Sequence, residues 1–298
     1  FLSISSMTIT VSTSYAAAPA QRRDQVPGYY RYELGKFEVT AIYDGNADLD
    51  FQLIQGASPE EIHALLARSF ADHGQVVPTS VNAYLVNTGD HLVLGVAGAG
   101  NCLGPAMGKR RCNIKAAGYK REDVDTVLLT HLDPEHTCGV VDSTGQRAFP
   151  NATLWTSEED LAFRSDEKLA AAAPESVKPY FQDALGSIKP YKAAGKFRPF
   201  KVGDAVLPGV EIVPTHGHTP GQTAYLFTSG PDSMLVLGDV VHNYAVQFPR
   251  PEIWVRYDQD HVKAVATREA LFERAAKSGW LLAGAHLPSL LIAQLYRS

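Results

Sequence analysis

The segment THLDPEHTCGV, residues 130–140, gathers metal-binding side chains at close spacing. It directly follows the apolar run VDTVLLT, which predicts a buried strand. His131 and Asp133 are two residues apart, so an extended backbone points both side chains the same way. The proline that follows favours the start of a helical turn, which places Glu135 and His136 on its first turn. The loop therefore offers up to four metal ligands at the end of one strand.

Three further candidate ligands stand where predicted strands end. His218 lies in the turn HGHTPG, Asp239 follows the apolar run MLVLG, and His286 follows GWLLAGA. A single histidine at a strand end is more often a hydrogen-bonded structural residue than a ligand. That alternative is weaker for the whole set, because strand ends deliver side chains to one rim of a sheet. We therefore expect these residues to share one site with the loop.

The predicted elements follow the order β-rich, helical, β-rich and helical, with no stretch typical of a linker between domains. Strand patterns begin near Gly35 and include a hairpin signal, Asn-Thr-Gly-Asp, at 87–90. We predict an α+β fold in which two sheets pack on each other with helices outside, as a single domain over residues 21–298. Helices are expected at 58–70, 157–164, 174–185 and 260–278.

Composition limits the partners. The 298 residues carry a net charge of −5 and no basic tract, so a nucleic-acid partner is not expected. Residues 1–20 are uncharged and end in small residues, as in the back half of a secretory signal, and an ordinary disordered N-terminus is the alternative. The same stretch is too short and too rich in serine and threonine to span a membrane. We expect a periplasmic or secreted protein with no membrane partner.

The three cysteines, Cys102, Cys112 and Cys138, do not make a disulfide framework, and the odd count leaves at least one unpaired. A Cys102–Cys112 bridge is conceivable but not favoured on spacing alone.

Read in order, the motifs Thr-His-x-acid-Pro-acid-His, Gly-His-Thr-Pro-Gly, Leu-Gly-Asp and Gly-Ala-His resemble those of metallo-β-lactamase-fold hydrolases. The segments VPGYYRYELGKFEVTAIYDG, VNAYLVNTGD and FPNAT resemble, within that superfamily, methyl parathion hydrolase and related organophosphorus hydrolases. The resemblance implies a four-layer αβ/βα sandwich and a homodimer. It also implies two divalent metal ions, zinc in the first place, with manganese, iron or cobalt as alternatives. One ion would be held by His131, Asp133, His218 and Asp239, and the other by Glu135, His136, Asp239 and His286, with Asp239 bridging.

Several positions depart from the family pattern. The family's first motif has histidine at position 133 and aspartate at position 135, so both changes keep a ligating atom but make the site richer in oxygen. Such a site leans toward harder metals. Val96 stands where the family carries an aspartate behind the ligands, a kind of loss that typically costs about 10–100-fold in metal affinity or activity. Gln222 replaces a histidine and can still form hydrogen bonds.

The resemblance also indicates the substrate pocket. Relatives tend to have aromatic side chains at the positions of Leu103 and Arg164, and Phe181 retains one, so these three residues are the expected pocket wall. The alternative for Arg164 is the usual expectation for an arginine, a side chain in solvent. Cys138 is expected to be structural, because its family position is not that of a reactive thiol.

The function that the resemblance implies is hydrolysis of organophosphorus triesters, with a small neutral ester as substrate. Two divalent ions about 3.5–4 Å apart make a bridging water lose its proton near neutral pH, and the resulting hydroxide attacks phosphorus. Asp239, Asp133 and Glu135 are the carboxylates expected to serve this step. Two alternatives remain open: a lactonase or arylesterase with the same two ions, and a pseudo-hydrolase that binds metal poorly.

Overall fold

The computed structural model describes residues 18–21, 25–100, 102–288 and 292–296. The expected secretory segment, residues 1–20, lies almost wholly outside the described residues. No helix in the described part of the chain is both long and apolar enough to cross a bilayer.

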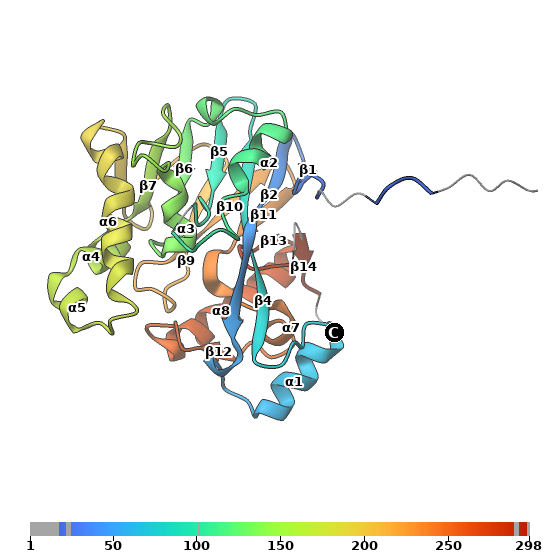
Figure 1. Cartoon of the computed structure of the whole chain (residues 1–298). Coiled ribbons are helices and arrows are strands. Elements are labelled where there is room, and N and C mark those ends of the chain that lie inside the picture. Colours follow the sequence, from blue (N-terminus) through green and yellow to red (C-terminus); the bar gives the residue numbers. More distant parts are fainter. Residues whose placement is uncertain (1–17, 22–24, 101, 289–291, 297–298) are drawn as a thin grey trace, which may run out of the picture.

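The larger sheet has seven strands in the order β1-β2-β4-β5-β6-β7-β8 (Figure 1). Pairing is antiparallel from β1 to β5 and parallel from β5 to β8. The hairpin predicted at 87–90 joins β4 to β5. The strands are β1 (Tyr29–Leu34), β2 (Phe37–Asp50), β4 (Val76–Asn87), β5 (Leu92–Gly95), β6 (Thr126–Leu128), β7 (Thr153–Ser157) and β8 (Phe197–Phe200).

The second sheet has five strands in the order β14-β13-β11-β10-β9. Only the β11–β13 pairing is parallel. These strands are β9 (Val210–Pro214), β10 (Thr223–Ser229), β11 (Asp232–Val236), β13 (Leu281–Ala283) and β14 (Ile292–Gln294). A separate two-stranded pair joins β3 (Ile54–Gln55) to β12 (Trp254–Val255).

Each of the four helices expected from the sequence is present, and one of them differs in its bounds by more than two residues. Further helices at 110–116, 167–172 and 244–247 were not among those four. The helix expected at 174–185 begins at Lys178 and continues to Ala193, because Ile188 and Tyr191 of its last turns are buried against the larger sheet. The helices are α1 (Pro59–Arg68), α2 (Arg110–Ala116), α3 (Pro134–Thr137), α4 (Glu158–Ser165), α5 (Glu167–Ala172), α6 (Lys178–Ala193), α7 (Tyr244–Gln247) and α8 (His261–Ser278). Short 3-10 turns are η1 (Phe51–Leu53), η2 (Arg121–Asp123), η3 (Cys138–Val140) and η4 (Gly238–Val240).

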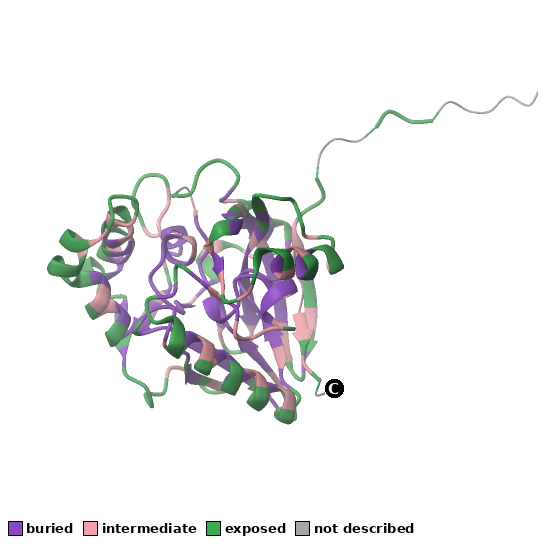
Figure 2. Ribbon diagram, turned by 90° about the horizontal axis from the view of Figure 1, so that it is seen from below, coloured by how far each residue is buried: buried purple, intermediate pink, exposed green. Residues whose placement is uncertain are grey.

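The two sheets pack face to face and helices cover their outer faces. The core between the sheets joins Tyr84 and Leu128 of the larger sheet to Tyr225 and Val236 of the smaller one. Helices α2 and α6 pack on the outside of the larger sheet, and α8 packs on the outside of the smaller one. Figure 2 shows buried strands in the interior and exposed helix faces around them. The predicted four-layer αβ/βα sandwich is confirmed.

The start of α4 fixes a close contact between the two halves. Ser157 caps the helix by accepting a hydrogen bond from the Asp160 amide at 3.0 Å, and its hydroxyl donates to the Gly221 carbonyl at 2.6 Å. A Cβ at Gly221 would collide with the Asp160 backbone nitrogen and the Ser157 hydroxyl. Glycine is therefore required at this crossing.

We predict that Gly221→Ala lowers the free energy of unfolding by about 1–3 kcal/mol, because the added methyl group overpacks a rigid contact. Gly186→Ala is the matched control: it lies within α6, and a Cβ there meets nothing within 4 Å. It should be neutral or stabilising by up to about 1 kcal/mol, through helix propensity alone. Urea unfolding measures both, and equal effects would contradict the assigned crossing.

Candidate metal centre

Loops from both sheets bring the predicted ligands to the same edge of the sandwich. His131 follows β6 of the larger sheet, while His218 follows β9, Asp239 lies in η4 after β11, and His286 follows β13 of the smaller sheet. Glu135 and the other histidine of the loop lie on α3, the helical turn predicted after the proline. The structure therefore brings together all the metal-ligand candidates named from the sequence.

The loop after β6 is fixed by hydrogen bonds to distant segments. The Thr130 carbonyl accepts from the Thr223 amide at 2.9 Å, and the Leu132 amide donates to Asp160 at 2.6 Å. Asp160 is fully buried, and burial raises the pKa of its carboxyl. The loop backbone is therefore held to β10 and to the first turn of α4.

Asp239 lies at the centre of the cluster and is 1% exposed. Burial alone would raise the pKa of its carboxyl, but the surrounding histidines outweigh burial and hold the pKa well below its usual range. The carboxylate is therefore an ionised group shared by the imidazoles around it. Their Nε2 atoms approach its oxygens at 2.8 Å (His136), 3.2 Å (His286), 3.3 Å (His242), 3.7 Å (His218) and 3.9 Å (His131).

Two groups of side chains that share Asp239 could each hold a cation, and a third group, His218, His242 and Asp258, overlaps one of them at His218. Within each group the candidate ligand atoms lie within 4.8 Å of one another. The buried Nε2 atoms of His131, His136 and His218 make no hydrogen bond within the described chain, although they face a carboxylate. Unpaired imidazole nitrogens converging on buried carboxylates fit divalent metal ions. The first group is His131, His218 and Asp239, and the second is Glu135, His136, Asp239 and His286. Asp133, which was predicted for the first group, lies outside both, although one of its oxygens is 3.4 Å from Nε2 of His218.

Groups behind the cluster orient two of its imidazoles. Nδ1 of His218 lies 3.1 Å from an Asp258 oxygen, and Nδ1 of His286 donates to the Ser80 carbonyl at 2.8 Å. Burial lowers the pKa of His286, but Asp239 beside it outweighs burial and raises the pKa to about 9. These outer partners fix each ring so that its Nε2 faces the cluster.

Two members of the site were not predicted from the sequence. His242 stands three residues after Asp239, just past the end of η4, and this spacing was the available signal. Asp258 lies in the chain before α8 and gives no local signal, because its partner His218 is 40 residues away.

Arg164 is buried, so the expectation that it is solvated is wrong. Its side chain is 3% exposed and forms an ion pair with Asp133. Its guanidinium carbon lies 4.9 Å and 5.2 Å from the ring centres of Phe163 and Phe181. Burial lowers the pKa of Arg164 to about 10, which keeps the group charged at neutral pH. Stacking and the ion pair overcome the usual preference of arginine for solvent.

A pocket of about 230 Å³ opens on the cluster. Leu103 is part of its wall, as the sequence predicted, whereas Arg164 and Phe181 contact each other and are not among its lining residues. No lysine or arginine of the described chain lines it. Its wall consists of Ala47, Asp48, Leu49, Thr79, Val81, Leu103, Tyr180 and Tyr257, with Asp133, Glu135, His242 and His286 from the cluster.

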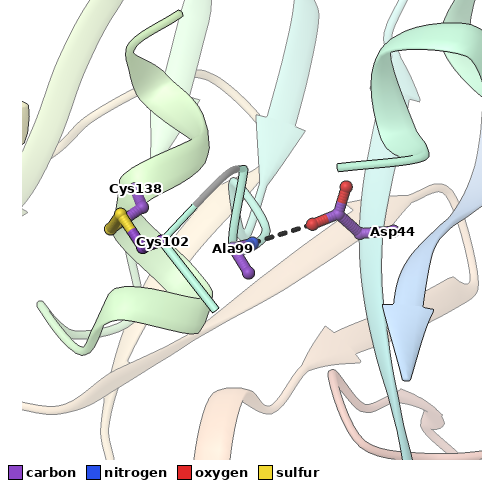
Figure 3. Close-up of a disulfide and its surroundings, with 4 residues drawn as sticks. All are labelled: Asp44, Ala99, Cys102 and Cys138. Carbon is purple, nitrogen blue, oxygen red and sulfur yellow. Dashed lines mark hydrogen bonds between the residues drawn. A yellow bond between two sulfur atoms is a disulfide. The ribbon is translucent and has the colours of Figure 1, made fainter. Parts of the chain in front are cut away.

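The loop that carries Leu103 is fastened on two sides (Figure 3). Cys102 forms a disulfide with Cys138, which follows α3, and the Ala99 amide donates to buried Asp44 at 2.8 Å. The cysteine left unpaired is Cys112, which is exposed. The conceivable Cys102–Cys112 bridge is therefore not formed, and the bond that does form joins the pocket wall to the ligand-bearing turn.

The sequence pattern of the Metallo-beta-lactamase superfamily matches residues 76–277, which include every ligand candidate except His286. The chain belongs to this superfamily. It is similar to the hydrolase AbOPH of the beta lactamase superfamily, with 39% identity, a TM-score of 0.88, and coverage of 92% of this chain and 95% of that one.

Two further proteins resemble this chain, the first in fold and the second in sequence. AidC, a dizinc quorum-quenching lactonase, has 23% identity and a TM-score of 0.82, over 92% of this chain and 96% of that one. The probable metallo-hydrolase Rv2300c of Mycobacterium tuberculosis is 26% identical over 220 residues, which are 62% of this chain. The match spans 64% of the length of that relative.

We predict that Asp258→Asn weakens zinc binding by about 10–100-fold, because the amide no longer orients His218 through a charged hydrogen bond. Asp72→Asn is the matched control, since Asp72 also pairs with a histidine, His63, at 2.9 Å but lies on a partly exposed surface. Zinc per chain after dialysis against a weak chelator measures both. Equal retention in the two variants would contradict the role of Asp258.

We predict that replacing both Cys102 and Cys138 with serine lowers the free energy of unfolding by about 3–4 kcal/mol, because the bond closes a long loop. Cys112→Ser, which removes the exposed free thiol, should leave stability unchanged. Urea unfolding without reductant compares the variants. Wild-type stability in the double serine variant would contradict this contribution.

Proposed function

We propose that the protein is a metal-dependent hydrolase of small neutral esters, with organophosphorus triesters as the first substrate class. The observation that carries the proposal is the position of the two ligand groups, which share Asp239 and lie beside a pocket with no lysine or arginine among its described lining residues.

The ligand set supports two divalent ions, zinc first, with manganese, iron or cobalt as alternatives that the carboxylates favour. Ions held there would activate water for attack and polarise the ester oxygen. Asp239 belongs to both groups and would be a ligand shared by the ions. Ser80 and Asp258 keep the rings of His286 and His218 turned toward the cluster.

The pocket supports a neutral, partly apolar substrate. Leu49, Val81 and Leu103 offer aliphatic surface for alkyl or aryl groups of an ester, and no lysine or arginine lines the described pocket to pair with an anionic substrate. A phosphotriester with a nitrophenolate leaving group fits this surface and needs no acid to assist the leaving group.

Lactones are the second candidate substrate class, favoured by two phenols in the pocket. Tyr180 and Tyr257 both line it, and for each the pKa is raised, first by burial and then by the negative charge of Glu135. Both phenols therefore stay protonated and can donate hydrogen bonds. An opening lactone releases an alkoxide, which needs a proton, whereas a nitrophenolate does not.

We also propose that the protein works in an oxidising compartment, either the periplasm or the exterior of the cell. The Cys102–Cys138 disulfide supports this, because such bonds persist mainly outside the cytosol.

The test measures zinc content per chain and then kcat/KM for methyl parathion and for an N-acyl homoserine lactone. We expect about two equivalents of zinc, faster turnover of the triester, and loss of both activities in Asp239→Asn. Asp232→Asn is the matched control, because it removes an exposed carboxylate from β11 outside the cluster.

Faster turnover of the lactone, with a selective loss in Tyr180→Phe or Tyr257→Phe, would make the protein a lactonase. Failure to bind zinc or manganese would contradict the metal-dependent function and favour a pseudo-hydrolase.

A further inference from the structure

Arg164 is a buried cation beside the ligand cluster, and the chemistry of ester hydrolysis does not account for it. It lies in the last turn of α4 and packs against the rings of Phe163 and Phe181, which also contact each other. Its Nη2 contacts Oδ1 of Asp133. Both partners are buried, so the pair is shielded from solvent.

Asp133 is the only acidic side chain that pairs with Arg164 in the described part of the chain. The Nε atom of Arg164 is buried and makes no hydrogen bond there. The aromatic rings stabilise the guanidinium but carry no net charge. Asp133 therefore supplies the negative charge that a buried cation requires.

The two oxygens of Asp133 have different neighbours. Oδ1 belongs to the ion pair with Arg164, whereas Oδ2 lies 3.4 Å from Nε2 of His218 and 3.8 Å from Nε2 of His131. One oxygen therefore remains directed at the first ligand group, next to the imidazole nitrogens that make no hydrogen bond.

The charges around the cluster add up in a particular way. Among the predicted metal ligands, Asp133, Glu135 and Asp239 bring three negative charges, and Arg164, paired with Asp133, reduces the sum to two. A neutral histidine at position 133 with an acid at position 135, as in the family motif, would also give two. The Asp133–Arg164 pair thus has the net charge of an imidazole and, like an imidazole, offers one atom to the cluster.

We propose that Asp133 and Arg164 act together as one neutral oxygen ligand in place of a histidine, with Arg164 as the positioning residue that sets the charge of the first ligand group. This proposal rests on the metal centre proposed above but not on its substrate.

The test is a set of substitutions read out by metal binding in the full chain. Zinc dissociation constants are measured by competition with a chromophoric chelator, and the coordination is followed by the absorption spectrum of the cobalt-substituted protein. The variants are Arg164→Met, Asp133→His and the two combined.

The expected result is a strongly non-additive cycle. Arg164→Met leaves the Asp133 carboxylate without a compensating charge, so its attraction to a metal cation grows. The dissociation constant of the more weakly bound zinc should fall by about tenfold or more. Asp133→His leaves Arg164 unpaired beside the ions and should weaken that zinc by about 100-fold or more. The combined variant should return to within about threefold of wild type, with a cobalt spectrum that shows nitrogen in place of oxygen.

Two control variants separate charge from packing. Arg164→Lys keeps the charge and should retain near-wild-type zinc affinity, whereas equal changes in Arg164→Lys and Arg164→Met would overturn the proposal. Arg147→Met also removes an arginine near an aromatic ring, that of Tyr191. Because the Arg147 side chain donates to the Pro150 backbone carbonyl and not to a carboxylate, this change should leave zinc affinity unaltered.

The proposal would be overturned if the changes in zinc affinity of the two single variants simply added in the combined variant. It would also be overturned if Arg164→Met weakened zinc binding as Asp133→His does. If wild-type protein binds no zinc, the metal centre itself fails. Two equivalents in the wild type with an additive cycle would reject only the paired ligand.

Discussion

The structure depends on keeping one buried carboxylate ionised. An unpaired charge inside a protein costs several kcal/mol or more, so Asp239 can persist at 1% exposure only with compensating groups around it. Five imidazoles approach it, and each comes from a loop or turn at the same edge of the sandwich. This requirement explains why the loops are tied so firmly, through contacts such as Leu132 to Asp160 and His286 to Ser80.

Local signals in the sequence predicted much of the fold and most of the cluster. Apolar runs that end in a histidine or an aspartate marked strand ends, and strand ends in a layered fold share an edge. The proline after Asp133 correctly placed Glu135 and His136 on a helical turn. The extent of α6 was harder to predict, because packing of Ile188 and Tyr191 on the sheet carries the helix past Gly186.

The features that the sequence did not predict all depend on contacts between distant segments. Asp133 meets Arg164 across 31 residues, and Cys102 meets Cys138 across 36. Neither pairing follows from the spacing of the residues, because a strand of the larger sheet lies between the two partners in each case. The usual exposure of arginines gave the wrong expectation for Arg164. The sequence around it does not reveal that two aromatic rings and the Asp133 carboxylate surround its guanidinium in the fold. Val96 adds a backbone example: its φ of +62° is strained for a β-branched residue, although it lies in the core between the sheets.

The division of the ligands between the sheets has a consequence for the stability of the whole domain. His131 and His136 belong to loops of the larger sheet, whereas His218, Asp239 and His286 belong to the smaller one. Any cation that binds all of them bridges the two halves, and the unfolded chain does not present these groups together. By thermodynamic linkage, its binding free energy adds to the cohesion of the sandwich. A metal ion bound at this centre would therefore hold the two sheets together in addition to any part it takes in catalysis.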